Sequence, residues 1–224
     1  MRHPRISKRL AMTCRRELQR HLTNGGFMSG YETRQSRRRY ALPHRLLHWV
    51  VALILLGSAA TGMTLGMLGF EGAMDAFGQD GTNLLYTSHK SLGIAVLGCM
   101  LLRLATRVGY GRPAYGRPLP LWQQLASTIS HGTLYLLLFI VPILGWLATG
   151  AGGFPVQFLD YHLPPLIGRD DALSAQLFVI HGWLARALFA LIVIHVLAAL
   201  QHWLIRRDEV MGRISLFRQD NAPL

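Results

Sequence analysis

The stretch FVIHGWLARALFALIVIHVLAALQHW, Phe178 to Trp203, decides the fold, because it is apolar enough to cross a lipid bilayer and yet contains histidines. About 20 predominantly apolar residues suffice for a transmembrane helix. An ionisable side chain in hydrocarbon is costly and by default marks a functional site. The histidines of this stretch, His181, His195 and His202, are therefore candidates for a function within the membrane.

The composition of the whole chain agrees with a membrane protein. Of the 224 residues, 51% are hydrophobic and only 15% are charged, which is more apolar surface than a soluble domain buries. The formal net charge of +12 would also suit a nucleic-acid-binding protein. A nucleic-acid interface needs its Lys and Arg on one polar face, whereas here they stand at the edges of apolar runs, so we expect no nucleic-acid partner.

Four apolar runs are long enough, and poor enough in charge, to span a bilayer. They are approximately Pro43–Gly66, His89–Ala105, Ser130–Thr149 and Gln176–Ile205. The first run begins too late, and too many spans follow it, for it to be a cleaved signal peptide. The sequence therefore predicts an all-α fold, an integral membrane four-helix bundle over residues 40–214.

The charges between the runs predict the orientation of the bundle. Residues 1–39 contain eleven Lys and Arg, and further arginines follow in Arg103–Pro120 and in the C-terminal tail. The other two loops, Leu68–Ser88 and Gly150–Ala175, are acidic. Because positive loops stay in the cytoplasm, both termini and the middle loop are expected there. Four transmembrane helices then run N-in and C-in.

Residues 1–39 are expected to form a basic cytoplasmic arm that is disordered or lies on anionic lipid, and residues 215–224 a cytoplasmic tail. Translation starting at Met28 would remove most of this arm. The two cysteines, Cys14 and Cys99, lie far apart in this topology. Neither a CxxC nor a CxxCH motif occurs, so the sequence indicates neither a zinc knuckle nor a covalently attached haem.

The histidines on the runs fall into two pairs at two depths. His181 and His195 are fourteen residues apart, which corresponds to about 21 Å along a helix and to directions within about 40° of each other. His89 begins the inward-running second span and so lies level with His181 at the outer side. His48 stands just inside the cytoplasmic start of the first span, nearer the level of His195.

Paired imidazoles on facing helices favour haem over zinc. Zinc prefers four ligands at one site, and neither a carboxylate nor a thiolate is available at these depths. Haem iron needs only two axial ligands from the protein, and the core of a helix bundle is a common place for it. Small residues near the ligands would give a porphyrin room, although the same residues also suit ordinary helix packing in membranes. They are Ala52, Gly57, Gly93, Gly182, Ala185, Ala198 and Ala199.

Four segments together resemble the prokaryotic cytochrome b561 family of four-helix, di-haem b membrane proteins. They are RYALPHRLLHWVVALIL, HKSLGIAVLGCMLLRLATR, HGTLYLLLFIVPILGWL and HGWLARALFALIVIHVLAALQHWLIRRDEV, within residues 40–214 apart from the first letter. The resemblance implies that His48, His89, His181 and His195 are the axial ligands of two haems b. It also implies a multi-pass protein of the bacterial inner membrane that exchanges electrons with the quinone pool, with ubiquinone as redox partner. Some stand-alone members resemble superoxide oxidases, which pass an electron from superoxide to ubiquinone.

Other polar residues of the spans have two interpretations each. His131 and Tyr135 share one helix face and are either contacts of a quinone or interfacial anchors. Lys90 either attracts superoxide to the outer mouth or is an interfacial lysine. His44 and His202 are interpreted as interfacial groups or neighbours of the ligands rather than as ligands.

Two other functions remain open at this point. The chain is alternatively the membrane-anchor cytochrome of a separate oxidoreductase, such as a hydrogenase-type complex, or more remotely a haem-free proton or metal transporter with a histidine relay. The colour of the purified protein separates the transporter from the cytochromes. The absence of a large outer loop favours a stand-alone oxidoreductase over an anchor.

Overall fold

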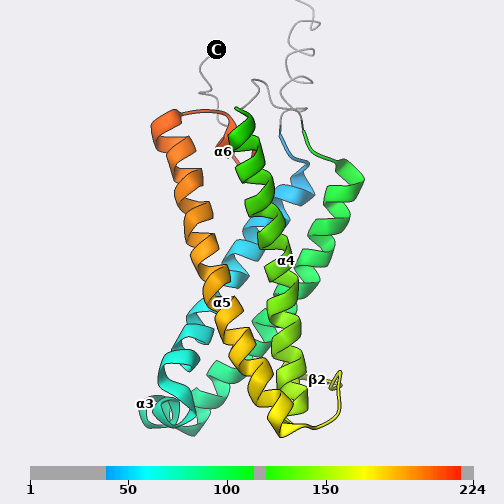
Figure 1. Cartoon of the computed structure of the whole chain (residues 1–224), viewed down its shortest axis with the longest axis vertical. Helices are drawn as coiled ribbons and strands as arrows, with labels where there is room; N and C mark the ends of the chain where they lie inside the picture. Colours follow the sequence, from blue (N-terminus) through cyan, green and yellow to red (C-terminus); the bar gives the residue numbers. More distant parts are fainter. Residues whose placement is uncertain (1–38, 114–119, 218–224) are drawn as a thin grey trace, which may run out of the picture.

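The computed structural model describes residues 39–113 and 120–217. The elements follow in the order α3, α4, β1, β2, α5, η1 and α6. Figure 1 shows long helices that run roughly along one axis, with the ends of α3 and the α6 segment at the same end of the molecule. Most of the predicted basic arm, including Cys14, and the tail beyond Phe217 lie outside the described residues.

Helix α3, Leu42–Tyr110, contains both of the first two predicted spans in 69 residues. Its backbone leaves the helical conformation at Gly69 (φ 67°, ψ −172°) and Gly78 (φ 66°, ψ −175°). Positive φ is open to glycine because it has no Cβ. The helix therefore has two long limbs, residues 42–68 and 79–110, joined by a short helical segment at the bottom of Figure 1.

The segment between these limbs corrects one expectation. The sequence predicted a loop at Leu68–Ser88, whereas this segment is helical apart from the two glycines. It contains no proline, so no residue in it blocks helical hydrogen bonding. The reversal of direction is instead concentrated at Gly69 and Gly78.

Helix α4 spans Leu121–Ala151 and α5 spans Asp171–Leu200. The π-helix η1, Gln201–Arg206, continues α5, and a short helix α6 follows at Val210–Ile214. Helix α4 begins earlier than the predicted Ser130, directly after Pro120, and proline is well suited to the start of a helix.

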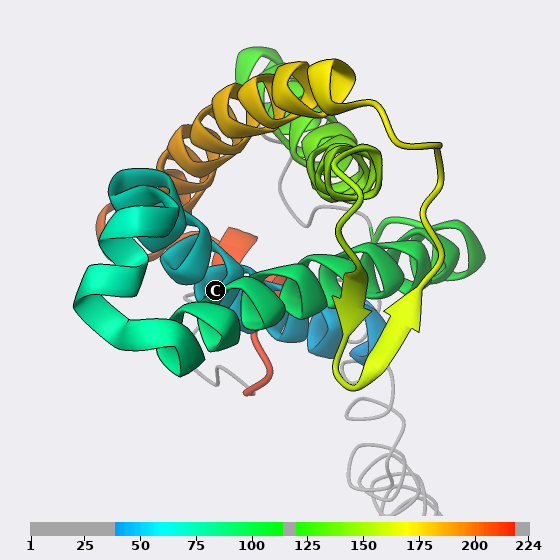
Figure 2. The ribbon, with the colours of Figure 1, turned by 90° about the horizontal axis from the view of Figure 1, so that it is seen from below.

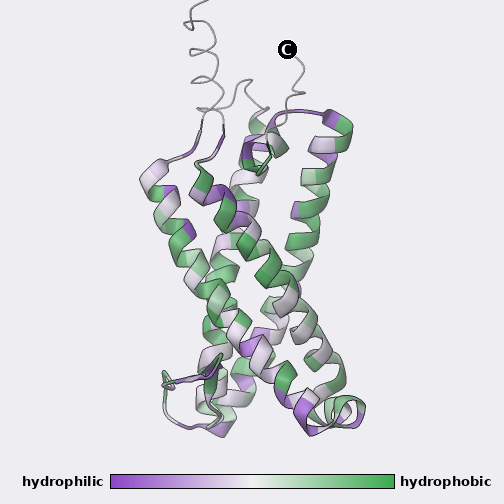
Figure 3. Cartoon of the chain, turned by 180° about the vertical axis from the view of Figure 1, so that it is seen from behind, coloured by the Kyte–Doolittle hydropathy of each residue, from purple (hydrophilic) through white to green (hydrophobic). Residues whose placement is uncertain are grey.

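Three helices of the described residues are long and apolar enough to cross a membrane, namely α3, α4 and the continuous Asp171–Arg206 helix. Figure 3 shows apolar residues along the middle of the bundle and hydrophilic ones gathered toward its ends. The chain is therefore a mostly helical protein of the membrane class, as predicted. The helix count is one below the number of predicted spans because α3 contains two of them.

A small β-hairpin is an addition to the predicted all-α fold. Strand β1, Val156–Phe158, pairs antiparallel with β2, Tyr161–Leu163. Pro155 and the Pro164–Pro165 pair bracket the two strands, and proline interrupts helical hydrogen bonding. Figure 2 shows the hairpin crossing one limb of α3, with which β1 is in contact.

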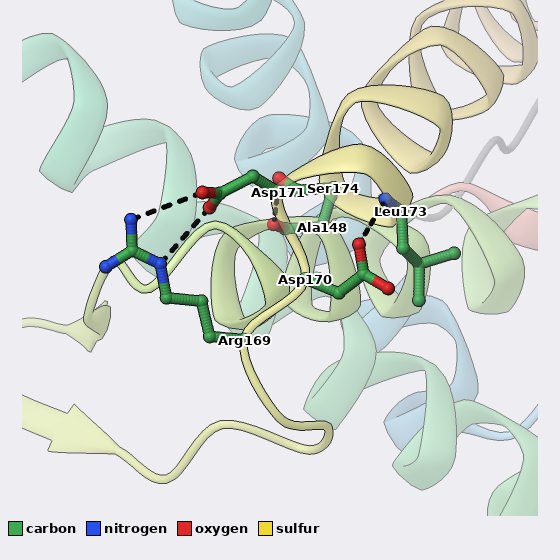
Figure 4. Close-up of polar contacts among 6 residues, drawn as sticks. All are labelled: Ala148, Arg169, Asp170, Asp171, Leu173 and Ser174. Carbon is green, nitrogen blue, oxygen red and sulfur yellow. Dashed lines mark hydrogen bonds and ion pairs between the residues drawn. The ribbon is translucent and has the colours of Figure 1, made fainter.

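Polar contacts hold the start of α5 against the end of α4 (Figure 4). The Asp170 side chain caps α5 by accepting from the Leu173 N–H at 2.9 Å, which satisfies a free donor of the first turn. The Ser174 hydroxyl donates to the Ala148 carbonyl at 2.8 Å. These contacts fix the axial position of α5, and so the depth of its histidines.

The apolar core joins both limbs of α3 to α4 and α5. Side chains from each limb of α3, from α4 and from α5 meet in this core, and each of the core residues has less than one tenth of its surface exposed. They are Val51, Val96, Met100, Leu134, Leu138, Val141 and Leu188. This core holds the rods in the register that brings the histidines of different helices together.

Candidate functional site

The structure brings four of the predicted site histidines together as two pairs. His48 on the first limb of α3 faces His195 on α5, with ring centroids 6.4 Å apart and planes at 72°. His89 on the second limb faces His181 on α5, with centroids 6.2 Å apart and planes at 85°. These are the pairs that the sequence predicted from depth.

The spacing within each pair suits one shared metal ion. With metal–nitrogen bonds of about 2.0–2.1 Å and nitrogens about 1.1 Å from the ring centre, two imidazoles on opposite sides of a metal have centroids roughly 6.3 Å apart. Among residues 39–113 and 120–217, no three His, Cys, Asp or Glu side chains group as a metal site. A set of two histidines is the ligand set of haem iron, whose other four ligands come from the porphyrin.

Backbone carbonyls orient the His89–His181 pair, which is named the outer pair after its expected side, as the His48–His195 pair is named the inner pair. His89 Nδ1 lies 3.0 Å from the Ser58 carbonyl oxygen, and His181 Nδ1 lies 2.9 Å from that of Val141. A ring whose Nδ1–H donates to a carbonyl has its lone pair on Nε2, which is the usual arrangement of a metal-ligating histidine. Both outer rings therefore have Nε2 available as a ligand.

Two glycines that sequence reasoning missed make room for the outer rings. A Cβ added at Gly62 would lie 2.6 Å from His89 Cε1, and one at Gly145 would lie 3.1 Å from His181 Cε1. No pattern in the sequence separates them from other membrane glycines. By contrast, a Cβ at the predicted Gly57 would meet Leu92 instead of a histidine, which is ordinary helix packing.

The inner pair has a third histidine beside it. The ring of His131 on α4 lies 5.2 Å from that of His195, at 88°. His131 Nδ1 lies 2.6 Å from the Ser127 carbonyl oxygen, so this ring is also held by backbone. The structure thus places His131, a predicted quinone contact, directly next to the inner pair. His48 Nδ1 is buried and has no hydrogen-bond partner among the described residues.

Tyr135, the other predicted quinone contact, lies against two arginines of α3. The guanidinium carbons of Arg103 and Arg107 are 5.5 Å and 5.4 Å from the centre of its ring. Its hydroxyl oxygen is buried without a hydrogen-bond partner in the described part of the chain. Sequence reasoning counted Arg103 only as a cytoplasmic charge, although its position inside the second predicted span was a signal.

The remaining predicted residues have other partners. His44 stacks on Tyr40 at 4.8 Å, and its Nδ1 lies 3.3 Å from the Thr106 hydroxyl. His202 Nδ1 lies 2.5 Å from an Asp208 carboxylate oxygen. Lys90 Nζ donates to the Pro155 carbonyl at 3.0 Å, so this ammonium group helps to hold the outer hairpin beside His89.

Comparison with known proteins shows the family of the chain. Residues 39–215 match the prokaryotic cytochrome b561 family. Cytochrome b561 homolog 2 of Escherichia coli K12 is 31% identical over 79% of this chain and 90% of that protein. Cytochrome b561 homolog 1 of the same organism is 27% identical over 79% and 96%. The probable superoxide oxidase CybB of Yersinia pestis is 29% identical over 56% of this chain and 72% of that protein. The chain therefore belongs to the prokaryotic cytochrome b561 family of membrane-integral, haem b-binding electron-transfer proteins.

Proposed function

We propose that this chain is a di-haem cytochrome that moves electrons across the bacterial inner membrane and exchanges them with the quinone pool. The observation that supports this proposal most directly is the two histidine pairs between α3 and α5, with centroid separations of 6.4 Å and 6.2 Å. His48 and His195 would hold the inner haem, and His89 and His181 the outer one. When bound, haem b supplies reversible one-electron transfer.

The proposed topology has four spans, with both termini in the cytoplasm. The spans are the two limbs of α3, then α4, then α5 with η1. The Tyr40 N–H donates to the Arg213 carbonyl at 3.1 Å, which joins the start of α3 to α6 at one end of the bundle. Because basic residues gather at that end, the positive-inside rule supports a cytoplasmic position for it and for the inner pair.

At the inner end, His131 and Tyr135 are proposed to bind ubiquinone. The buried Tyr135 hydroxyl has no partner in residues 39–113 and 120–217, and a buried polar group without a partner is costly. A quinone carbonyl oxygen would satisfy it. His131 would donate from or accept at Nε2, since Nδ1 is bonded to Ser127.

At the outer end, superoxide is the proposed electron donor and Lys90 its point of entry. Support comes from the name of the Yersinia pestis relative, a probable superoxide oxidase, and from the position of Lys90 next to His89. The lysine ammonium has three N–H donors, of which one goes to the Pro155 carbonyl. The others are available for a small anion.

The purified protein is expected to be red and to contain two haems b per chain. The haems should be extractable into acid acetone because no CxxCH motif tethers them. A pyridine haemochrome assay against protein concentration measures the ratio. A ratio near one would contradict the two-site proposal, and a colourless protein would favour the transporter.

Lys90→Glu is expected to slow reduction of the haems by superoxide, because it replaces an attracting charge with a repelling one. The wild-type rate should also fall as salt rises, since screening confines an exposed charge to about 8–10 Å at physiological salt. Stopped-flow absorbance at several ionic strengths measures both effects.

Lys90→Arg is the matched control, because it keeps the charge and a donor for Pro155. Reduction by a quinol analogue should change little in either variant. If Lys90→Glu does not change the rate of haem reduction by superoxide at low salt, the proposal that superoxide enters beside Lys90 is wrong. The protein would then be better described as an anchor cytochrome, and a co-purifying oxidoreductase would be the finding to seek.

A further inference from the structure

Arg103 is a buried cation on the second limb of α3. Only 9% of the residue is exposed, and its Nε has no hydrogen-bond partner among the described residues. The ion pairs within residues 39–113 and 120–217 are Arg169–Asp171 and His202–Asp208. Arg103 therefore has no carboxylate partner in the described part of the chain.

A buried guanidinium needs a counter-charge. Arginine does not lose its proton in proteins, so it cannot become neutral as a buried lysine or carboxyl group does. Removing a charge from water is expensive unless an opposite charge and hydrogen bonds replace the solvent. The ring and the hydroxyl of Tyr135 lie against the guanidinium and offer some attraction, but a neutral phenol supplies no counter-charge.

None of the acidic side chains in residues 39–113 and 120–217 forms an ion pair with Arg103. Six of its acidic residues belong to the outer segments, and two follow η1 near the cytoplasmic end. They are Glu71, Asp75, Asp80, Asp160, Asp170 and Asp171 at the outer end, and Asp208 and Glu209 after η1. Asp208 is bonded to His202. Among residues 39–113 and 120–217 no carboxylate pairs with Arg103, which leaves a bound anionic group as the counter-charge that we consider.

The position of Arg103 assigns that group to the inner site. Its guanidinium carbon lies 5.5 Å from the centre of the Tyr135 ring. Tyr135 follows His131 by one turn of α4, and the His131 ring lies 5.2 Å from that of His195. Arg103 therefore lies at the end of the bundle that holds the inner pair.

We propose that Arg103 binds a propionate carboxylate of the haem held by His48 and His195, and that it raises the reduction potential of this haem above that of the outer one. The proposal rests on the function proposed above. A planar guanidinium matches a carboxylate with two parallel hydrogen bonds. A neighbouring positive charge disfavours the more positive, oxidised iron. Electrons that enter at the outer end then move downhill toward the quinone side.

The test compares full-length, haem-loaded wild type with Arg103→Gln in an optical redox titration. We expect the oxidised-to-reduced ratio of the inner haem to rise at least tenfold at a given potential, which for one electron is about 59 mV. The outer haem should not shift and serves as an internal reference. Variants that lack one haem, described in the Discussion, identify which transition belongs to which site.

Arg107→Gln is the matched control, since Arg107 lies one turn further along α3, against the same Tyr135 ring, but is half-buried. Its effect on the inner potential should be clearly smaller. Resonance Raman adds a readout of the contact itself, because the propionate bending mode of the inner haem should shift in Arg103→Gln and stay in Arg107→Gln. If Arg103 only stabilised the fold, its replacement would not shift the propionate bending mode in particular.

If Arg103→Gln does not fold, the same measurements are made on Arg103→Lys. Lysine keeps the charge but binds as a point charge instead of a planar fork, so the propionate mode should move while the potential changes less than tenfold. Unchanged potentials and an unchanged Raman mode in a folded variant would overturn the proposal. So would an effect confined to the KM for quinol, which would place Arg103 in the quinone site. Absence of haem from the wild type would instead refute the proposed function.

Discussion

His195→Ala is expected to leave about one haem b per chain, with the inner haem missing and the outer haem retained. The reason is that His195 is one of the two imidazoles facing each other across 6.4 Å in the proposed inner site, so its removal takes away one of the two bonds that this site offers to the iron. His48→Ala should have the same result. His89→Ala and His181→Ala should instead remove the outer haem. Pyridine haemochrome ratios and optical spectra of each purified variant measure this.

His44→Ala and His202→Ala are matched controls and should retain both haems. His44 stacks on Tyr40, and His202 is paired with Asp208. Each ring therefore has a partner other than the proposed haem sites. Loss of a haem from His44→Ala but not from His48→Ala would show that the wrong member of this one-turn pair was chosen. His131→Ala tests the other neighbour, because its ring lies only 5.2 Å from that of His195. If His131→Ala lost the inner haem while His48→Ala retained it, His131 would replace His48 as the proposed partner of His195.

Gly62→Ala is expected to remove the outer haem although it replaces none of the proposed ligands. The new Cβ would lie 2.6 Å from His89 Cε1, a distance at which the ring has to move. Its Nδ1 is bonded to the Ser58 carbonyl, so the ring cannot turn away and still present Nε2 to iron. The haem content should fall to about one per chain, with the spectrum of the inner haem retained.

Gly66→Ala is the matched control, because it lies one turn further along the same limb and its Cβ would meet nothing within 4 Å. Alanine also favours a helix over glycine, so this variant should fold and retain both haems. Gly145→Ala, with a Cβ at 3.1 Å from His181 Cε1, should weaken outer haem binding less than Gly62→Ala. Full haem content in Gly62→Ala would show that the glycine has no role in holding the ring space open.

The membrane fold and the pairing of histidines were largely predictable from the sequence. Hydrophobic runs of membrane length and alternating loop charge are local properties of the chain. Helical periodicity converts the fourteen-residue spacing of His181 and His195 into two depths on one face, and the structure brings both rings to partners on α3. The assignment of these four residues as haem ligands stays a prediction, which the variants above test.

Other features depended on contacts between segments far apart in the sequence. The roles of Gly62 and Gly145 exist only because the rings of His89 and His181 are packed against them. The placement of His131 beside His195 follows from how α4 packs against α5. The helical form of the segment between the spans, and the hairpin in the last outer loop, were likewise not predicted.

The sequence by itself determined the class of this protein, because the lipid bilayer imposes length and polarity on each segment separately. It also predicted the spacing of the histidines along each helix, since that spacing is a count of residues. Only the tertiary structure decided which side chains meet across the bundle, and that Arg103 is buried without a carboxylate among the described residues. Burial and charge pairing are properties of neighbours in space, and packing between helices chooses those neighbours.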